Sequence, residues 1–215
     1  MSQLSIKEKY DFENPFKPDR LSRKALKYFT RGGNLLDVGC GEGADSVFFV
    51  KNGFHVTAID RNQTYLKRFR AYRKDTHLSN ISILHRDVVN YRFPPNTFDA
   101  IISILVLCCM KRNEFDAMLR SMKRSVKRGG IIVMSSRNYL DPELKDYLST
   151  EKMIEGNTFR KKEDCSRFVY FIEKNRLSEA FIDFDILYYF EGYAPCKYDE
   201  HPKHGDSYII CRRKR

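Results

Sequence analysis

A loop of alternate glycines follows an apolar segment early in the chain. The segment Leu35–Val38 contains one acid, Asp37, and three glycines follow it: Gly39, Gly41 and Gly43. Glycine has no Cβ, so the backbone can turn sharply there and a ligand can lie against the main chain. A helix that starts after such a loop presents unpaired N–H groups to the ligand. The segment therefore predicts a nucleotide-cofactor loop between a strand and a helix.

Two cofactor classes fit these glycines. Gly39, Gly41 and Ala44 satisfy the G-x-G-x-x-G/A pattern, in which the loop binds the pyrophosphate of a dinucleotide such as NAD. Asp37 separates the two classes, because a carboxylate close to the loop repels a pyrophosphate and attracts a sulfonium or an ammonium group. The acid favours S-adenosylmethionine over NAD.

The loop resembles the first motif of class I S-adenosylmethionine-dependent methyltransferases, hh-D-x-G-x-G-x-G with h apolar, at every position. Val56–Asp60 resembles the second strand of that family, and Ile83–Val88 resembles the third. The resemblance implies that Asp60 binds the ribose hydroxyls and that Asp87 with Val88 binds the adenine. The full set of cofactor contacts that it implies is Asp37, Gly39, Cys40, Gly41, Gly43, Asp60, Arg61, Asp87, Val88 and Ser103.

The elements that must position these residues alternate between strand and helix patterns, as in a parallel sheet with helices on both faces. Phe98–Ser103 resembles the fourth strand and Gly129–Met134 the fifth. Between them, one apolar stripe at helical spacing predicts a covering helix; it consists of Phe115, Met118, Leu119, Met122 and Val126. We therefore expect an α/β fold with a Rossmann-like, seven-stranded, mostly parallel sheet and a C-terminal antiparallel strand pair.

That final pair is expected where Ile182, Phe184 and Ile186 alternate with acids, and in the apolar run Ser207–Cys211. A helix is predicted from Lys162 to Glu179, and a lid over the substrate side from Asn138 to Phe159. We expect a single methyltransferase domain over residues 1–215, with three parts. These are an N-terminal helical cover (1–30) with Tyr10, Phe12 and Phe16 as its aromatic residues, a cofactor-binding half (31–136), and a substrate-side lid with the final strands (137–215).

Methyl transfer needs few catalytic groups, because the sulfonium is already activated and the enzyme mainly positions a nucleophile and excludes water. Reactants in open parallel sheets meet beyond the carboxyl ends of the strands. We therefore expect the acceptor near Leu105–Cys109 and near Arg137–Tyr139. The residues Ser103–Val106 lack the (N/D/S)-P-P-(Y/F) tetrad of enzymes that methylate the amino groups of bases. Cys108 and Cys109 follow an apolar run and are expected to be packed core thiols.

The C-terminal tail resembles that of the tellurite-resistance (TehB-like) methyltransferases and their small-molecule relatives. Glu191 and Gly192 precede a loop that carries His201 and His204. In that group a His-Arg pair of this loop is implicated near the substrate, whereas His204 is followed by Gly205. The resemblance implies that His204, or else His201, accepts a proton from the acceptor. An anion-holding role would then fall to Arg137 or Lys203.

Composition bounds the remaining alternatives. A chain of 215 residues with 42% hydrophobic content suits one core. The six cysteines form no C-x-x-C pair, so we expect no metal and no disulfide framework. Met1–Asp11 is polar and no stretch is apolar enough to span a membrane, so we expect a cytoplasmic protein.

The acceptor class is the point at which the sequence leaves alternatives open. A small-molecule or inorganic acceptor, such as a chalcogen oxyanion or a thiol, is favoured. The net charge of +11 supports an RNA or protein methyltransferase as the alternative, but the basic residues are dispersed and nucleic acid is not favoured. A non-catalytic module that binds S-adenosylmethionine is the third hypothesis. The acceptor atom and the oligomeric state do not follow from the sequence.

Overall fold

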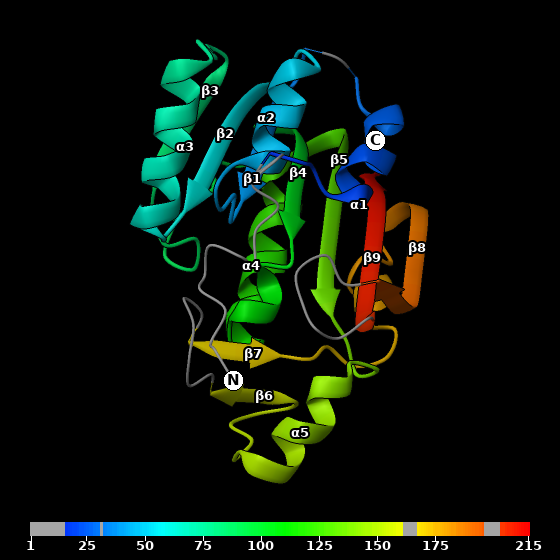
Figure 1. Ribbon diagram of the computed structural model, residues 1–215. Helices are drawn as coiled ribbons and strands as arrows, with labels where there is room; N and C mark the ends of the chain where they lie inside the picture. The colour runs from blue at the N-terminus through cyan, green and yellow to red at the C-terminus, as the bar shows by residue number, and fades with distance from the viewer. Residues whose placement is uncertain (1–15, 31, 161–166, 196–202) are drawn as a thin grey trace.

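A seven-stranded sheet forms the centre of the molecule, and its strand order is β3-β2-β1-β4-β5-β9-β8 (Figure 1). The computed structural model describes residues 16–30, 32–160, 167–195 and 203–215. The first five strands are parallel: β1 (Asn34–Val38), β2 (His55–Asp60), β3 (Ile81–His85), β4 (Phe98–Ile104) and β5 (Val126–Arg137). The last two strands are β8 (Phe184–Pro195) and β9 (Lys203–Arg213); β9 is antiparallel to both of its neighbours, β5 and β8. The predicted fold class is confirmed.

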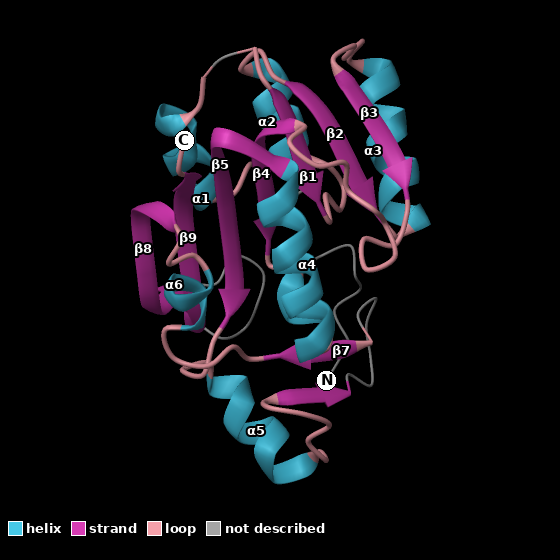
Figure 2. Cartoon of the chain, turned by 180° about the vertical axis from the view of Figure 1, so that it is seen from behind, coloured by secondary structure: helices cyan, strands magenta, loops and turns pink. Residues whose placement is uncertain are grey.

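Helices cover both faces of this sheet (Figures 1 and 2). One face carries α1 (Arg20–Ala25), the short helix η2 (Leu26–Tyr28), α2 (Ala44–Lys51) and α3 (Gln63–Asp75). The other face carries α4 (Arg112–Ser125) and α6 (Arg176–Ala180). The predicted apolar stripe faces the sheet from α4, where Phe115, Met118, Leu119 and Met122 are buried. Val126, the last member of that stripe, begins β5 instead.

A smaller layer lies beyond the carboxyl ends of β4 and β5, at the bottom of Figure 1. It contains α5 (Pro142–Thr150) and the two-stranded sheet of β6 (Thr158–Arg160) and β7 (Phe168–Tyr170), while η3 (Leu107–Cys109) directly follows β4. The layer has its own apolar cluster, formed by Leu144, Phe159, Val169 and Phe171. The predicted lid segment 138–159 therefore lies on the expected side of the sheet, and its function as a lid stays a prediction.

The helix predicted from Lys162 to Glu179 is wrong over residues 167–175 and correct only at its end, where residues 176–179 lie in α6. Residues 161–166 lie outside the described residues, and the chain then forms β7 and the short helix α6. Tyr170, Phe171 and Ile172 are all fully buried, which a one-sided helix does not allow. Pairing of β7 with β6 favours the strand over a helix in this segment, and β6 lies outside the predicted helix.

The predicted N-terminal cover is described only from residue 16. Asp19 caps α1 by accepting a 2.7 Å hydrogen bond from the Leu21 backbone N–H. The ring of Phe16 stacks on Tyr72 of α3 with 3.5 Å between ring centroids. Tyr10 and Phe12 lie outside the described residues. Among the helices of the described ranges, none combines the length and the hydropathy needed to cross a membrane.

Candidate active site

A cavity of about 360 Å³ opens at the carboxyl ends of β1, β2, β3 and β4. One end is lined by six of the residues that the sequence predicts for the cofactor, namely Gly39, Gly41, Asp60, Arg61, Asp87 and Val88. The ends of four strands meet here because the carboxyl ends of parallel strands lie at one edge of a sheet.

The glycine loop leaves space for a ligand at Gly41. Its φ is +54°, and a Cβ built there would meet no atom within 4 Å. The loop is fixed to β2, because Gly39 N–H and Cys40 N–H both donate to the Ile59 carbonyl, at 2.8 and 3.0 Å. The main chain therefore forms a rigid cradle that an added side chain would fill. The cradle fits the methionine part of an adenosyl cofactor.

Asp60 joins the loop to the next helix. Its Oδ2 accepts a 2.8 Å hydrogen bond from Gly41 N–H, and its Oδ1 accepts a 2.6 Å bond from Asn62 N–H. A carboxylate offers about four lone-pair sites, so both oxygens keep capacity for a further donor. Two vicinal ribose hydroxyls would satisfy that capacity.

Asp87 sits in a turn that exposes backbone to the cavity. Its Oδ1 accepts a 3.1 Å hydrogen bond from Val89 N–H, which fixes the turn after β3. Asp87, Val88, Val89 and Asn90 all line the cavity. This end suits a planar base, with apolar contact from Val88 and polar groups beside it.

Asp37 lies beneath the loop and is absent from the residues that line the cavity. Only 3% of the residue is exposed, and its Oδ2 accepts a 2.5 Å hydrogen bond from the Ser46 hydroxyl of α2. Burial, and after it the nearby Asp45, outweigh the lowering effect of the Ser46 hydrogen bond and together raise the pKa of Asp37 to about 8. The Asp37 carboxyl group therefore supports the glycine loop through its hydrogen bond to α2 and does not line the cavity.

Three other predicted cofactor residues also lie away from the cavity wall. Gly43 has a φ of +89°, and a Cβ there would come within 2.3 Å of the Phe69 ring, so this glycine allows α3 to pack closely. Cys40 is partly buried, and burial raises the pKa of its thiol. Ser103 is fully buried within β4, and its hydroxyl has no hydrogen-bond partner within the described ranges.

The other end of the cavity lies beyond β4 and is lined by Ile104, Leu105, Val106, Cys109, Met110, Glu114, Arg167 and Phe168. Leu105, Val106 and Cys109, from the segment where the acceptor is expected, line this end, and binding of the acceptor there stays a prediction. The expectation of two packed core thiols is correct for Cys108, which is buried, and wrong for Cys109, which is partly exposed and lines the cavity. Both cysteines belong to the short helix η3, and they differ in exposure.

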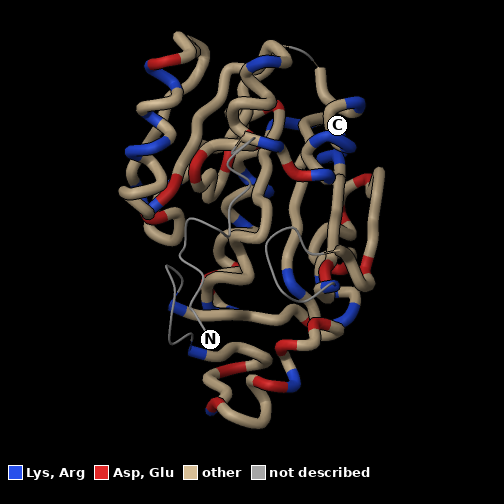
Figure 3. The backbone as a smooth tube through the Cα atoms, viewed as in Figure 1, with Lys and Arg blue, Asp and Glu red and all other residues tan. Residues whose placement is uncertain are grey.

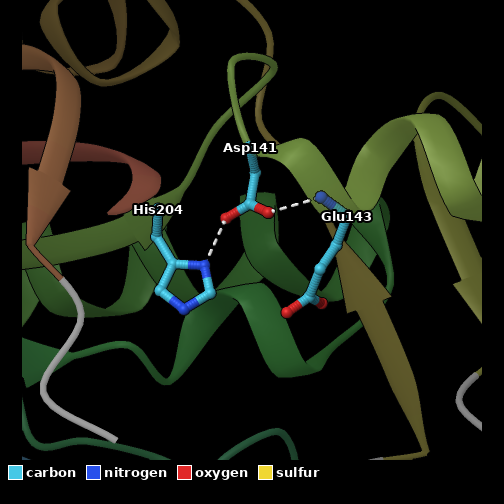
Figure 4. Close-up of side chains that lie close together, drawn as sticks. All are labelled: Asp141, Glu143 and His204. Atoms are coloured by element: carbon cyan, nitrogen blue, oxygen red, sulfur yellow. Dashed lines mark hydrogen bonds and ion pairs between the residues drawn. The ribbon is translucent and has the colours of Figure 1, made fainter. Parts of the chain in front are cut away.

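The predicted catalytic residues Arg137 and His204 lie together at the ends of β5 and β9, beside the start of α5. His204 Nδ1 is 3.1 Å from Asp141 Oδ2 (Figure 4). Arg137 forms ion pairs with Glu143 at 2.8 Å and with Asp141 at 3.5 Å. His204 is 5% exposed, and neither it nor Arg137 lines the described cavity. His201 lies outside the described residues.

This cluster has the residue types of a metal site but is already neutralised. One ligand atom each from Asp141, Glu143 and His204 lie within 4.8 Å of one another. The Arg137 guanidinium occupies the same carboxylates, and Asp141 Oδ1 also accepts a 2.9 Å hydrogen bond from Glu143 N–H, which caps α5. A metal ion would have to displace a cation from its partners. The cluster is an ion-pair network that fixes the start of α5.

Comparison with known proteins shows which family has this kind of cofactor loop. Residues 35–130 match the family model described as a methyltransferase domain. The chain carries an S-adenosylmethionine-dependent methyltransferase domain. The matched residues contain β1 to β4, the glycine loop and α4, so they include most of the described cavity wall.

Individual relatives resemble the methyltransferase domain at low identity. The probable S-adenosyl-L-methionine-dependent methyltransferase TehB of Haemophilus influenzae is 26% identical over 137 residues, which is 57% of this chain and 47% of TehB. The crystal structure of TehB from that organism superposes with a TM-score of 0.70 at 21% identity, covering 90% of this chain and 61% of TehB. That likeness shows the fold.

Two further relatives are named for other reactions. Carboxy-S-adenosyl-L-methionine synthase of Dichelobacter nodosus is 25% identical over 120 residues, 54% of this chain and 50% of its own length. Glycine N-methyltransferase of Mus musculus is 30% identical over 152 residues, 62% of this chain and 48% of its own length. The chain thus spans about half the length of these curated relatives.

Close packing explains why this methyltransferase domain lacks the His-Arg pair of the TehB-like tail. A Cβ at Gly205 would come within 2.1 Å of the Asp141 backbone nitrogen. The Gly205 carbonyl also accepts a 2.8 Å hydrogen bond from Asn138 N–H. The turn after β5 therefore occupies the space that an arginine side chain would need.

Several residues of the methyltransferase cavity were not predicted: Asn62, Tyr65, Val89, Asn90, Met110, Glu114, Arg167 and Phe168. Asn62 lies two residues after the predicted strand-end acid Asp60, so its position was a usable signal. Arg167 and Phe168 reach the cavity only because β7 lies beyond η3, and no local pattern indicates that.

Proposed function

We propose that the protein transfers the sulfonium methyl group of S-adenosylmethionine to a small-molecule or inorganic acceptor. The observation that carries this proposal is one cavity that extends from the glycine loop to the residues after β4. A volume of about 360 Å³ is in the range of small-molecule sites. A methyl donor and a small acceptor would meet there, beyond the carboxyl ends of the strands.

The residue roles follow from their positions in the cavity. Gly39 and Gly41 would hold the methionine part, Asp60 the ribose hydroxyls, and Asp87 with Val88 the adenine. Asp37 is a positioning residue, since it reaches the cofactor only through the loop. When bound, S-adenosylmethionine supplies an activated methyl group. The protein then has to hold the acceptor in line and exclude water.

The acceptor end offers two charged side chains, Glu114 and Arg167, among apolar and sulfur-containing neighbours. Arg167 supports an anionic or polar acceptor, and Glu114 is held by a 2.9 Å hydrogen bond from Lys111 N–H. The proton-accepting role of His204 or His201 and the anion-holding role of Arg137 stay predictions. His204 and Arg137 lie in a buried network and do not line the described cavity, and His201 lies outside the described residues.

The alternative of an RNA or protein substrate rests on charge. Lys and Arg are spread over α3 and many other elements (Figure 3) and do not gather around the cavity alone. Part of this charge is paired, as in the 2.6 Å ion pair between Arg68 and Glu42. A non-catalytic module that binds S-adenosylmethionine would need the same cavity, so turnover alone separates it from an enzyme.

The test is calorimetric titration with S-adenosylmethionine and separately with NAD, on the unmodified protein, Asp60→Ala and Asp75→Ala. Asp75 is an exposed acid at the end of α3 and is the matched control. We expect binding of S-adenosylmethionine alone, loss of roughly 2 kcal/mol or more of binding free energy in Asp60→Ala, and no change in Asp75→Ala. Binding of NAD, or of neither ligand, would contradict the proposal.

Turnover is then measured as release of S-adenosylhomocysteine with selenite, tellurite and small thiols as acceptors. Tight cofactor binding without turnover on any acceptor would favour the non-catalytic module. Retention on RNA that falls steeply with salt would favour the RNA methyltransferase.

A further inference from the structure

Two adjacent thiols lie at the acceptor end of the cavity. Cys108 and Cys109 belong to η3, which follows β4, and the sulfur-containing Met110 comes next. Cys109 and Met110 line the cavity together with Gly39 of the cofactor loop. Cys108 precedes them in the chain and is 4% exposed.

The backbone holds both sulfur atoms toward one carbonyl group. Cys108 Sγ donates to the Leu105 carbonyl at 3.3 Å, and Cys109 Sγ donates to the same oxygen at 3.7 Å. The hydrogen bond with Cys109 is the largest cause that raises the pKa of the Cys108 thiol well above its usual range, followed by burial. The two thiols are therefore neighbours in space, and at neutral pH Cys108 keeps its proton.

The turn that presents them is strained and firmly held. Leu105 has a φ of +53°, which is rare for a residue with a branched side chain. Its N–H donates to the Ser135 hydroxyl at 3.0 Å and to the Ser135 carbonyl at 3.3 Å, while its carbonyl accepts the two thiols. Backbone strain of this kind persists where the surroundings fix it, often at ligand sites.

We propose that Cys108 and Cys109 form a dithiol site for a trivalent metalloid hydroxide, with arsenite as the representative ligand. Each thiol replaces one hydroxide on arsenic: two As–S bonds form, two As–O bonds break, and the two thiol protons leave with the hydroxides as two water molecules. The oxidation state of arsenic is unchanged. The remaining hydroxide faces the cavity. The site deepens the proposed function and rests on it, because it places a soft, thiophilic ligand at the acceptor end.

Chelation explains why the pair matters more than either thiol. After the first As–S bond forms, the second thiol reacts intramolecularly at high effective concentration. Loss of one thiol should therefore weaken arsenite binding by roughly 100-fold or more. Cys211 offers a matched control, because it is a buried cysteine on β9 whose thiol faces the Ile132 carbonyl at 3.8 Å.

The experiment uses the full chain, reduced with a phosphine, incubated with sodium arsenite and desalted before arsenic is counted by mass spectrometry. We expect a single arsenic atom per chain in the unmodified protein and in Cys211→Ala, and nearly none in Cys108→Ser or Cys109→Ser. Circular dichroism checks that each variant is folded, and partly exposed Cys109 is the safer substitution. X-ray absorption should show two sulfur ligands and one oxygen ligand.

Arsenic retained by folded Cys109→Ser, or lost in folded Cys211→Ala, would overturn the dithiol site. Three sulfur ligands would do the same. Titration of the unmodified protein with S-adenosylmethionine keeps this result separate from the proposed function. Arsenite binding without cofactor binding would contradict the proposed function and support the dithiol site. Cofactor binding without arsenite binding would contradict only the dithiol site.

Discussion

Ser46 of α2 donates a 2.5 Å hydrogen bond to the buried carboxyl group of Asp37 on β1. The bond spans the base of the glycine loop and ties the strand before it to the helix after it. Because Asp37 is buried and its pKa is raised to about 8, the carboxyl group that supports the cofactor loop is mostly protonated at neutral pH.

This proton predicts how stability varies with pH. The ordinary pKa of an aspartate is 3.8, and that of folded Asp37 is about 8. Between these values the native state binds more protons than the unfolded state, so the contribution of Asp37 to the free energy of unfolding falls as pH rises. The slope is at most about 1.4 kcal/mol per pH unit. Urea unfolding of the unmodified protein and Asp37→Asn from about pH 4 to pH 8 should show curves that converge or cross. Parallel curves would show that Asp37 is ionised throughout.

Cofactor binding should release a proton. S-adenosylmethionine carries a sulfonium and an ammonium group, and positive charge beside the loop lowers the pKa of a carboxyl group. Near neutral pH, binding should therefore ionise part of the protonated Asp37. Calorimetry in two buffers of different ionisation enthalpy measures the number of protons released. Asp37→Asn should bind without this release, and equal release from both proteins would assign the proton to another group.

Gly43→Ala should destabilise the protein more than Gly129→Ala. Both glycines have positive φ, at +89° and +77°, but an added Cβ meets the Phe69 ring only at Gly43 and meets nothing within 4 Å at Gly129. Gly129→Ala should cost about 1–2 kcal/mol of backbone strain. Gly43→Ala should cost roughly 1–3 kcal/mol more from overpacking. Thermal unfolding measures both, and Phe69→Leu should recover part of the loss in Gly43→Ala only.

Asp141→Ala should break the ion-pair network at the start of α5 and lower the free energy of unfolding. The side chain of Asp141 caps the helix, contacts His204 and neutralises Arg137, and it is fully buried. Removal of one partner from a buried pair costs roughly 3–5 kcal/mol. Asp146→Ala, at an exposed position on the same helix, should stay within about 0.5 kcal/mol of the unmodified protein. Similar unfolding midpoints for the two variants would refute this role of Asp141.

Local patterns were sufficient for most of the sheet. Apolar runs that end in an acid or begin at a glycine indicated the strands, and the stripe on α4 indicated the face that packs on them. These signals succeed because each side chain has a fixed direction in a helix or strand. The helix predicted from Lys162 to Glu179 failed at β7 because this strand pairs with β6, which lies outside the predicted helix, and because the adjacent residues Val169 and Tyr170 are both buried.

The sequence by itself determined the fold class, the cofactor loop and the acids that end the strands. Asp37 and Asp60 belong to the same kind of signal, an acid at the end of an apolar run. Only the tertiary structure decided that Asp60 lines the cavity while Asp37 lies beneath the loop. It likewise decided that Cys109 lines the cavity while Cys108 is buried. The spacing of residues in the sequence fixes the direction of each side chain within one helix or strand. The exposure of that side chain depends on which elements, distant in the sequence, pack against it.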